Sequence, residues 1–199
     1  MTTVYLIRHG KIPQVAPRCF IGQQDLPLTD QGRRQITRLA EYLATKAIDR
    51  VVTSPLLRCR QSTDILCGRL QNMNAEVNAN LREISLGTWE GQSVAQVRAR
   101  FPGDYESRGQ DPLHFRPSQG ESFVDLLDRV WPTFQAIAAT SSGKRVAIVT
   151  HAGVIRVLLF RILAMIPNEF FHLKLDYGCL TVLDHDGSCW RAGNINFQP

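Results

Sequence analysis

The tripeptide Arg8-His9-Gly10 directly follows an apolar run, 4–7, so a basic and a nucleophilic side chain stand where a buried strand would end. A neutral imidazole can attack phosphorus, and the resulting phosphohistidine divides one difficult displacement into two easier ones. A guanidinium beside it offers forked donors that match the oxygens of a phosphate. The tripeptide therefore predicts phosphoryl transfer through His9, with Arg8 on the phosphate.

Three further residues could complete such a site: Arg58 near the start of a predicted helix, Glu83 after a possible strand, and His151 after the apolar run 146–150. A carboxylic acid can protonate a leaving oxygen, and a second histidine, if protonated, adds positive charge beside the transferring group. Amides of the Ala152-Gly153 turn could also contact the phosphate. Because this arrangement supplies so much fixed positive charge, it predicts chemistry without a metal or any other cofactor.

Each of these residues has an ordinary interpretation when it is taken alone. Arg58 could form a surface ion pair, Glu83 could be a solvated loop acid, and His151 could be a satisfied polar residue at a strand end. Arg8 is harder to explain in this way, because an arginine that directly follows a buried strand requires an anionic partner. The combination therefore favours a functional site.

Apolar and amphipathic segments alternate along the chain as in βαβα folds, which predicts one domain over 1–199 with a three-layer α/β/α sandwich and a mostly parallel sheet. The carboxyl ends of such strands form the usual ligand-binding edge. Strands are predicted at 4–8, 51–53, 76–79 and 146–150, with a closing hairpin of 180–184 and 189–193. Four helices are predicted. The first is capped by Thr29, and the second is capped by Ser54, has Pro55 at its first position and ends near 68. The third covers 121–139 with a bend at Pro132, and the fourth covers 154–165.

Residues 87–120 interrupt this alternation, since glycines, prolines, arginines and aromatic residues are mixed there without long periodicity. We expect a lid or pocket wall over the carboxyl edge of the sheet, which would determine substrate specificity. Packing within the lid is the preferred interpretation of its candidates for contact with a leaving group, which are Trp89, Tyr105, His114, Phe115 and Arg116.

Several segments resemble the motifs of the histidine phosphatase superfamily, also called the phosphoglycerate-mutase-like superfamily. They are Leu6-Ile7-Arg8-His9-Gly10, Asp25-Leu26-Pro27-Leu28-Thr29, Thr53-Ser54-Pro55-Leu56-Leu57-Arg58, Leu81-Arg82-Glu83 with Gly87-Thr88-Trp89-Glu90-Gly91, Gly120-Glu121-Ser122 and Val149-Thr150-His151-Ala152-Gly153. The resemblance implies a phosphorylated His9, a phosphate pocket completed by Arg8, Arg58 and His151, and Glu83 as general acid and base.

The resemblance also implies that Gly22 or Gln23 lines the pocket from the loop after the first strand. If Glu83 is not the proton donor, the next acids in line are Glu90 and Glu121.

The activity that the resemblance implies is hydrolysis of a phosphomonoester. Residues 18–22 and 84–87 are similar to the α-ribazole-phosphatase-like group of cobalamin synthesis, which makes α-ribazole 5′-phosphate a candidate substrate. A cofactor-dependent phosphoglycerate mutase is the alternative, although such mutases usually carry a longer insertion between the acid and the second histidine. A non-catalytic module that binds phosphorylated ligands is a third interpretation, disfavoured because every core residue is present.

The composition places further limits on partners and location. With 44% hydrophobic and 21% charged residues, the 199-residue chain suits a globular domain, and its five cysteines are predicted to be free thiols, with Cys59 a candidate for oxidation beside Arg58. The net charge of +5 favours small anionic partners, but no run of lysines and arginines indicates nucleic-acid binding. No signal-peptide pattern opens the chain, and 154–166 is too short to span a bilayer. We therefore expect a cytoplasmic monomer or homodimer without a membrane partner.

Overall fold

The computed structural model describes residues 1–13, 17, 19–71 and 73–199 of the chain. Six strands form one sheet in the order β3-β2-β4-β1-β5-β6. Strands β1 to β4 run parallel to one another, and β5 and β6 continue the sheet as an antiparallel hairpin, as predicted. The strands are β1 Thr2–Arg8, β2 Arg50–Thr53, β3 Ala75–Val77, β4 Arg145–Thr150, β5 Leu180–His185 and β6 Trp190–Ala192.

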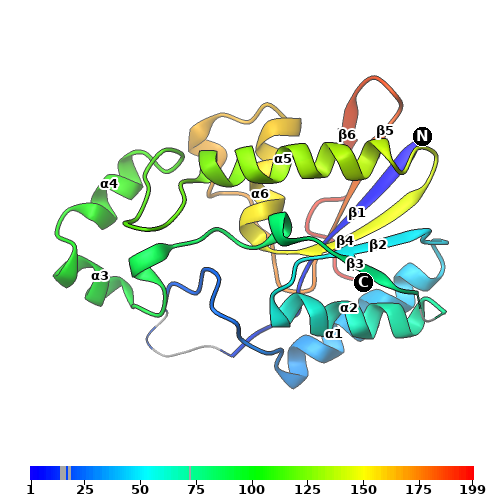
Figure 1. The fold of residues 1–199 in the computed structure, drawn as a ribbon, viewed down its shortest axis with the longest axis horizontal. Helices are drawn as coiled ribbons and strands as arrows, with labels where there is room; N and C mark the ends of the chain where they lie inside the picture. Colours follow the sequence, from blue (N-terminus) through cyan, green and yellow to red (C-terminus); the bar gives the residue numbers. More distant parts are fainter. Residues whose placement is uncertain (14–16, 18, 72) are drawn as a thin grey trace.

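Helices cover both faces of this sheet and complete the predicted three-layer α/β/α sandwich (Figure 1). On one face lie α1 (Asp30–Ala44) and α2 (Leu57–Arg69), and on the other lie α5 (Phe123–Ala139) and α6 (Ala152–Ile162). Two short helices, α3 (Val94–Arg100) and α4 (Asp104–Gln110), stand apart from these layers, beyond the carboxyl end of β1. Across the described residues, no helix has the length and apolarity that crossing a membrane requires.

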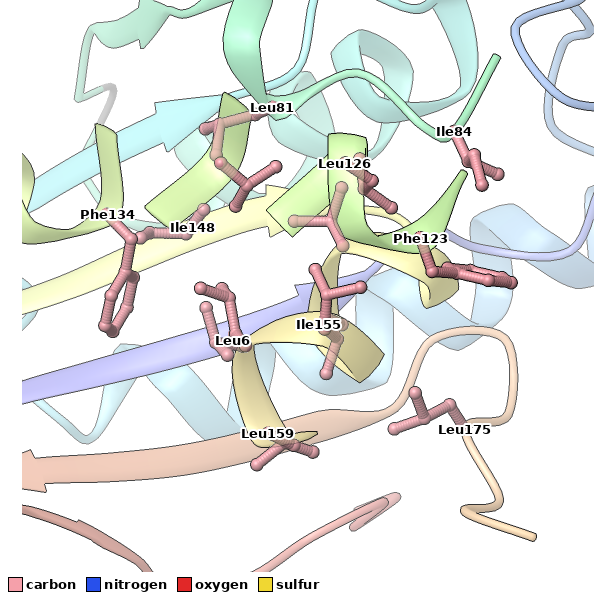
Figure 2. Close-up of a cluster of buried hydrophobic side chains, with 14 of the residues drawn as sticks. Leu6, Leu81, Ile84, Phe123, Leu126, Phe134, Ile148, Ile155, Leu159 and Leu175 are labelled. Carbon is pink, nitrogen blue, oxygen red and sulfur yellow. The ribbon is translucent and has the colours of Figure 1, made fainter. Parts of the chain in front are cut away.

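Apolar side chains on both faces of β1 explain its place inside the sheet. Tyr5 and Ile7 pack with α1 and α2, whereas Leu6 belongs to the cluster under α5 and α6, where Figure 2 shows it together with Ile155. A strand that is buried on both faces is apolar along its length. After Thr2 and Thr3 the strand is apolar apart from the Tyr5 hydroxyl, and the next polar side chain comes where the strand ends, at Arg8.

Several element boundaries differ from those predicted. The helix α2 begins at Leu57 and not at Ser54, because the Ser54 amide still bonds to the Val149 carbonyl (3.0 Å) and extends the sheet. The strand β3 ends two residues early because its partner β2 ends there too. The helix α6 starts at Ala152, directly after β4, and ends three residues early, whereas Thr29 caps α1 as predicted.

The predicted lid, residues 87–120, contains α3 and α4 and is more regular than its sequence indicated. Backbone hydrogen bonds from Phe20 to Gln92 (2.9 Å) and from Gly91 to Phe20 (2.7 Å) join it to the loop after β1. The Trp89 side chain is fully buried in the main core and packs on the ring of Phe20. The lid and the loop are therefore fixed to each other and to the core below them.

The loop that leaves β1 passes closely over the first turn of α1, and two glycines permit this approach. A Cβ atom on Gly10 would lie 2.4 Å from the Gly32 carbonyl oxygen, and a Cβ atom on Gly32 would lie 2.2 Å from the Lys11 carbonyl oxygen. Both obstacles are backbone atoms, which cannot rotate away as a side chain can. Because Gly10 follows His9, this contact fixes the point at which His9 leaves the sheet.

We predict that Gly32→Ala lowers the free energy of unfolding by about 2 kcal/mol, because the added methyl group overpacks a backbone contact. Gly68→Ala is the matched control, since Gly68 also lies in a helix but has open space at its Cβ position. In Gly68→Ala the free energy of unfolding should rise by up to about 1 kcal/mol, because alanine has the higher helix propensity. Urea denaturation measures both changes, and equal stability of the two variants would contradict the tight contact at Gly32.

Candidate active site

A cavity of about 820 Å³ lies at the carboxyl edge of the sheet, where the ends of β1 and β4 face the lid. Most of the site residues predicted from the sequence line it, namely Arg8, His9, Gly22, Arg58, Glu83 and Ala152. Two of the predicted residues do not line it. His151 is fully buried against Arg58, and Gln23 faces the main chain of Glu83.

His9 is held as a neutral imidazole whose Nε2 is unprotonated. Its Nδ1 lies 2.8 Å from the Gly10 carbonyl oxygen, so the hydrogen-bond pattern assigns the proton to Nδ1. Nε2 accepts a hydrogen bond from Arg58 Nε at 3.2 Å. Burial, reinforced by the charges of Arg58 and Arg8, holds the pKa of His9 well below 6.5. The side chain is therefore in the state that a nucleophile requires.

The Arg58 guanidinium is almost completely buried, and each of its three nitrogens donates a hydrogen bond to the protein, which leaves two N–H groups for a ligand. Its Nε also lies 3.3 Å from His151 Nδ1, while Nη1 donates to the Gln24 carbonyl (2.6 Å) and Nη2 to the Gly22 carbonyl (2.8 Å). The loop after β1 therefore contributes backbone acceptors that orient the arginine. This geometry leaves little rotational freedom in a charge that faces the cavity.

A protonated His151 would add positive charge beside the transferring group, but the structure favours the neutral imidazole. Burial, together with the charge of Arg58, holds the pKa of His151 well below 6.5. With Nδ1 facing Arg58, Nε2 carries the proton and donates to Ser54 Oγ at 2.7 Å. The histidine thus acts here as a hydrogen-bonding support beside His9, with ring centroids 5.2 Å apart.

The Cys59 thiol does not suit the oxidation-sensitive role considered from the sequence. It is fully buried, with Sγ 3.4 Å from His151 Nε2, and burial raises the pKa of the thiol. Oxidation proceeds through an accessible thiolate. Cys59 therefore packs behind the site as a small apolar residue.

Glu83 lines the cavity from the segment after the short 79–81 turn, and its carboxylate reaches the start of α6. Its Oε2 accepts from the Gly153 amide at 3.2 Å and its Oε1 accepts from the Ile84 amide at 3.0 Å. A Cβ atom on Gly153 would lie 2.2 Å from Oε1, so a larger residue at this position would displace the carboxylate. The amide that was expected to bind phosphate is instead occupied by this carboxylate, which benefits from the helix N-terminus.

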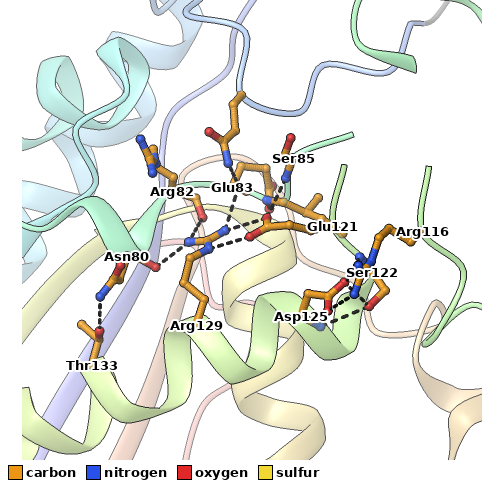
Figure 3. A network of polar contacts seen from close by, with 12 residues as sticks. Asn80, Arg82, Glu83, Ser85, Arg116, Glu121, Ser122, Asp125, Arg129 and Thr133 are labelled. Atoms are coloured by element: carbon orange, nitrogen blue, oxygen red, sulfur yellow. Dashed lines mark hydrogen bonds and ion pairs between the residues drawn. The ribbon is translucent and has the colours of Figure 1, made fainter. Parts of the chain in front are cut away.

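A polar network fixes the main chain around Glu83, and Figure 3 shows Arg129 at its centre. Arg129 donates to the carbonyls of Asn80 (2.7 Å) and Glu83 (3.3 Å) and pairs with Glu121 at 2.8 Å. Gln23 Nε2 donates to the same Glu83 carbonyl at 2.9 Å. No local sequence signal pointed to this support, because Arg129 and Gln23 are distant in sequence from the residue that they hold.

The two alternative acids have other partners in the structure. Glu121 pairs with Arg129 and accepts from the Ser85 amide at 2.9 Å, while Glu90 Oε1 accepts from the amides of Gln23 and Leu86. Neither acid lines the cavity. The geometry therefore leaves Glu83 as the carboxylate that faces the imidazole.

The lid residues divide as the packing interpretation suggested. Four of the five candidates do not line the cavity, whereas Tyr105 does. Trp89 packs on Phe115, His114 pairs with Asp111, and Arg116 pairs with Asp125.

Sequence reasoning missed Tyr177, which lies in the loop before β5. Its ring centroid is 3.8 Å from Arg8 Cζ and 5.6 Å from the His9 ring, and the side chain lines the cavity. Arg8 also donates to the Leu175 carbonyl in the same loop. The position of Arg8 therefore depends on a segment that shows no motif of its own.

Comparison with known proteins agrees with this arrangement. The family model described as histidine phosphatase superfamily (branch 1) matches residues 4–198. A probable phosphoglycerate mutase GpmB from Klebsiella pneumoniae is 29% identical over 195 residues, which cover 96% of this chain and 89% of that one. A mycobacterial glucosyl-3-phosphoglycerate phosphatase structure is 26% identical, with 99% of each chain covered and a TM-score of 0.86. An α-ribazole phosphatase from Shigella flexneri shares the fold at 24% identity, with a TM-score of 0.88 over 98% of this chain and 96% of that one.

The two buried neutral histidines predict a loss of stability in mild acid. An unfolded histidine takes up a proton near pH 6.5, whereas His9 and His151 resist protonation in the folded state. As the pH falls from 6.5 to 5, the unfolded chain therefore binds more protons, and each histidine lowers the free energy of unfolding by up to about 1.4 kcal/mol per pH unit.

Urea unfolding at several pH values measures this slope. The two histidines contribute about equally to the slope of the free energy of unfolding against pH. His151→Gln should therefore remove about half of this contribution and leave the half that belongs to His9. The same substitution at the exposed His114 is the control and should not change it. A wild-type protein whose stability is flat over this interval would contradict the neutral, buried pair.

Proposed function

Because the chain belongs to the histidine phosphatase superfamily, branch 1, we propose that it hydrolyses a small-molecule phosphomonoester through a phosphohistidine on His9. The observation that carries the proposal is the neutral His9 imidazole, whose Nε2 faces Arg58 in a cavity that Glu83 also lines. A nucleophile, fixed positive charge and a proton donor thus share one cavity. The named relatives support phosphatase chemistry at the level of the family.

The first step transfers the phosphoryl group to the enzyme. Arg8 and Arg58 hold the phosphate oxygens, so that the phosphorus faces Nε2 of His9. The Nε2 lone pair forms the N–P bond while the bond between phosphorus and the ester oxygen breaks. Glu83, in its protonated form, gives its proton to that departing oxygen, and the leaving group departs as an alcohol.

The second step releases phosphate and restores the enzyme. The Glu83 carboxylate takes a proton from a water molecule, whose oxygen attacks the phosphorus as the N–P bond breaks. The Nε2 lone pair returns to His9, whose proton stays on Nδ1 and is donated to the Gly10 carbonyl oxygen throughout. The guanidiniums stabilise the charge of the transferring group in both steps, and for this reason we propose that the reaction requires no metal ion.

A phosphoglycerate mutase is the alternative function, because relatives such as the probable GpmB of Klebsiella pneumoniae carry that name. In that case a second acid would take the phosphoryl group from His9 instead of water. Phosphate release and interconversion of 2- and 3-phosphoglycerate, measured on the same sample, separate the two. Within the phosphatase proposal, α-ribazole 5′-phosphate remains a candidate from the sequence resemblance, and the Shigella flexneri structure at 24% identity supports the fold alone.

We predict hydrolysis of an aryl phosphate in the presence of EDTA, and a fall of about 1,000-fold or more in kcat/KM for His9→Ala, which removes the nucleophile. The exposed His114 provides the control variant His114→Ala. Rapid quenching with labelled substrate should trap a phosphoenzyme in the wild-type protein and not in His9→Ala. Retained activity in that variant would rule out His9 as the nucleophile.

We predict that Glu83→Gln slows the hydrolysis of alkyl phosphates more than that of 4-nitrophenyl phosphate. A poor leaving group needs the proton during bond cleavage, whereas a nitrophenolate can leave without it. Values of kcat/KM over a series of leaving groups measure the difference as a slope against leaving-group acidity. Equal slowing of good and poor leaving groups would assign the proton to another group.

A further inference from the structure

Arg108 brings a further positive charge to the cavity from its lid side. It lies on α4 and lines the same cavity as Arg8 and His9. Its guanidinium is half-buried, and burial lowers its pKa, although an arginine stays charged at any physiological pH. The carbon Cζ lies 5.5 to 5.9 Å from the ring centroids of Phe20, Trp89, Phe123 and Phe171.

No protein group compensates this charge within the part of the chain that the structure describes. Arg108 forms neither a hydrogen bond nor an ion pair with the described residues. The nearest candidate on its own helix, Glu106, pairs with Arg98 at 2.8 Å. The aromatic rings lie near the outer limit of a cation–π contact, unlike the 3.8 Å between Arg8 and Tyr177. A half-buried charge without a partner is costly to keep.

The charges that line the cavity are unbalanced even when a phosphate is bound. Among the residues that the structure describes, the lining contains one carboxylate, Glu83, and four guanidiniums, which belong to Arg8, Arg58, Arg108 and Arg156. The proposed reaction uses Arg8 and Arg58 on the phosphate, and Arg156 interacts electrostatically with Glu83. Arg108 is the guanidinium that the reaction leaves without a counter-charge.

The shape of the cavity shows what surrounds that guanidinium. A volume of about 820 Å³ exceeds the needs of a phosphate and suits a ligand of drug size. Near Arg108 the lining is aromatic, with the side chains of Phe20, Tyr105, Phe123 and Phe171. A leaving group in this part of the cavity would meet apolar walls and one cation.

We propose that Arg108 binds an anionic group on the leaving part of the substrate. The substrate class is then a phosphomonoester whose leaving group carries a carboxylate or a second phosphate on an apolar body. This inference rests on the proposed function and narrows it, since a neutral leaving group such as that of α-ribazole 5′-phosphate would leave Arg108 uncompensated.

Two pairs of esters test the inference. The first pair consists of the phosphate esters of 3-(4-hydroxyphenyl)propionate and of its amide, whose phenols have nearly equal acidity because two methylene groups insulate the ring. We expect the wild-type protein to favour the carboxylate by about 10- to 100-fold in kcat/KM, as befits a charge-assisted hydrogen bond. A second pair, 1,5-pentanediol bisphosphate and pentyl phosphate, tests whether a phosphate on the leaving group produces the same preference as the carboxylate.

Substitutions then assign the preference to Arg108. Arg108→Met keeps an apolar stem without the charge and should reduce the ratio between charged and neutral esters to about 1, and Arg108→Lys should restore part of it. Arg100→Met is the matched control, because Arg100 is an exposed lid arginine that does not line the cavity. Its ratio should equal that of the wild-type protein, and circular dichroism checks the folding of each variant.

Two results would overturn the inference: equal hydrolysis of charged and neutral esters by the wild-type protein, or a preference that survives in Arg108→Met. Failure of the proposed function is a different result, namely no hydrolysis of any of the four esters. Binding of the matching arylmethylphosphonates, acid against amide, separates the two failures. Preferential binding of the acid, lost in Arg108→Met, would support the anion site even without turnover.

Discussion

The hydrogen bonds of Arg58 Nε to His9 and His151 are the interaction on which the site depends. One N–H group lies within 3.3 Å of both imidazoles, and each ring presents an unprotonated nitrogen to it. A buried guanidinium makes protonation of either ring unfavourable, and burial acts in the same direction. The contact that orients the nucleophile therefore also keeps it neutral, and with the hydrogen bond from Nδ1 of His9 to Gly10 it leaves the lone pair on Nε2.

Much of the surrounding fold serves to keep this guanidinium in place. Asp25 accepts from the Leu57 amide at 2.5 Å and so holds the first turn of α2, which carries Arg58. The carbonyls of Gly22 and Gln24, in the same loop, accept from the guanidinium itself. A loop without regular structure thus defines both the start of a helix and the direction of its functional side chain. The part of the loop from 20 to 25 is therefore held in place, and the backbone bonds of Phe20 to the lid restrict it further.

The sequence was sufficient to predict the positions of residues that depend only on the direction of the strands. Parallel strands bring their carboxyl ends to one edge, so the positions of Arg8, His9 and His151 followed from apolar runs alone. The orientation of Glu83 did not, because Arg129 and Gln23 hold it from segments 46 and 60 residues away. The lid helices are seven residues each, too short to show a helical period.

The charge state of His151 was also beyond reach of the sequence, since it depends on desolvation and on distances between side chains. The same reason hid Tyr177 and Arg108, whose neighbours come from distant segments. Residue type and spacing can identify groups that are able to react. Residue type and spacing cannot show which of these charged groups have a partner of opposite charge, because such partners can come from any chain segment that reaches the cavity.

The cavity combines two environments that the fold builds by different means. At the sheet edge, backbone acceptors and helix starts hold each reacting group in one geometry, as the Gly153 amide holds Glu83. On the lid side, aromatic side chains and Arg108 form a wall that makes no hydrogen bond to those groups within the described residues. Side-chain changes in this wall that leave the backbone bonds between the lid and the loop in place can therefore alter which leaving group fits without moving His9. Under the proposed function, the same reacting edge can therefore serve different leaving groups, because the residues that contact them lie in the opposite wall.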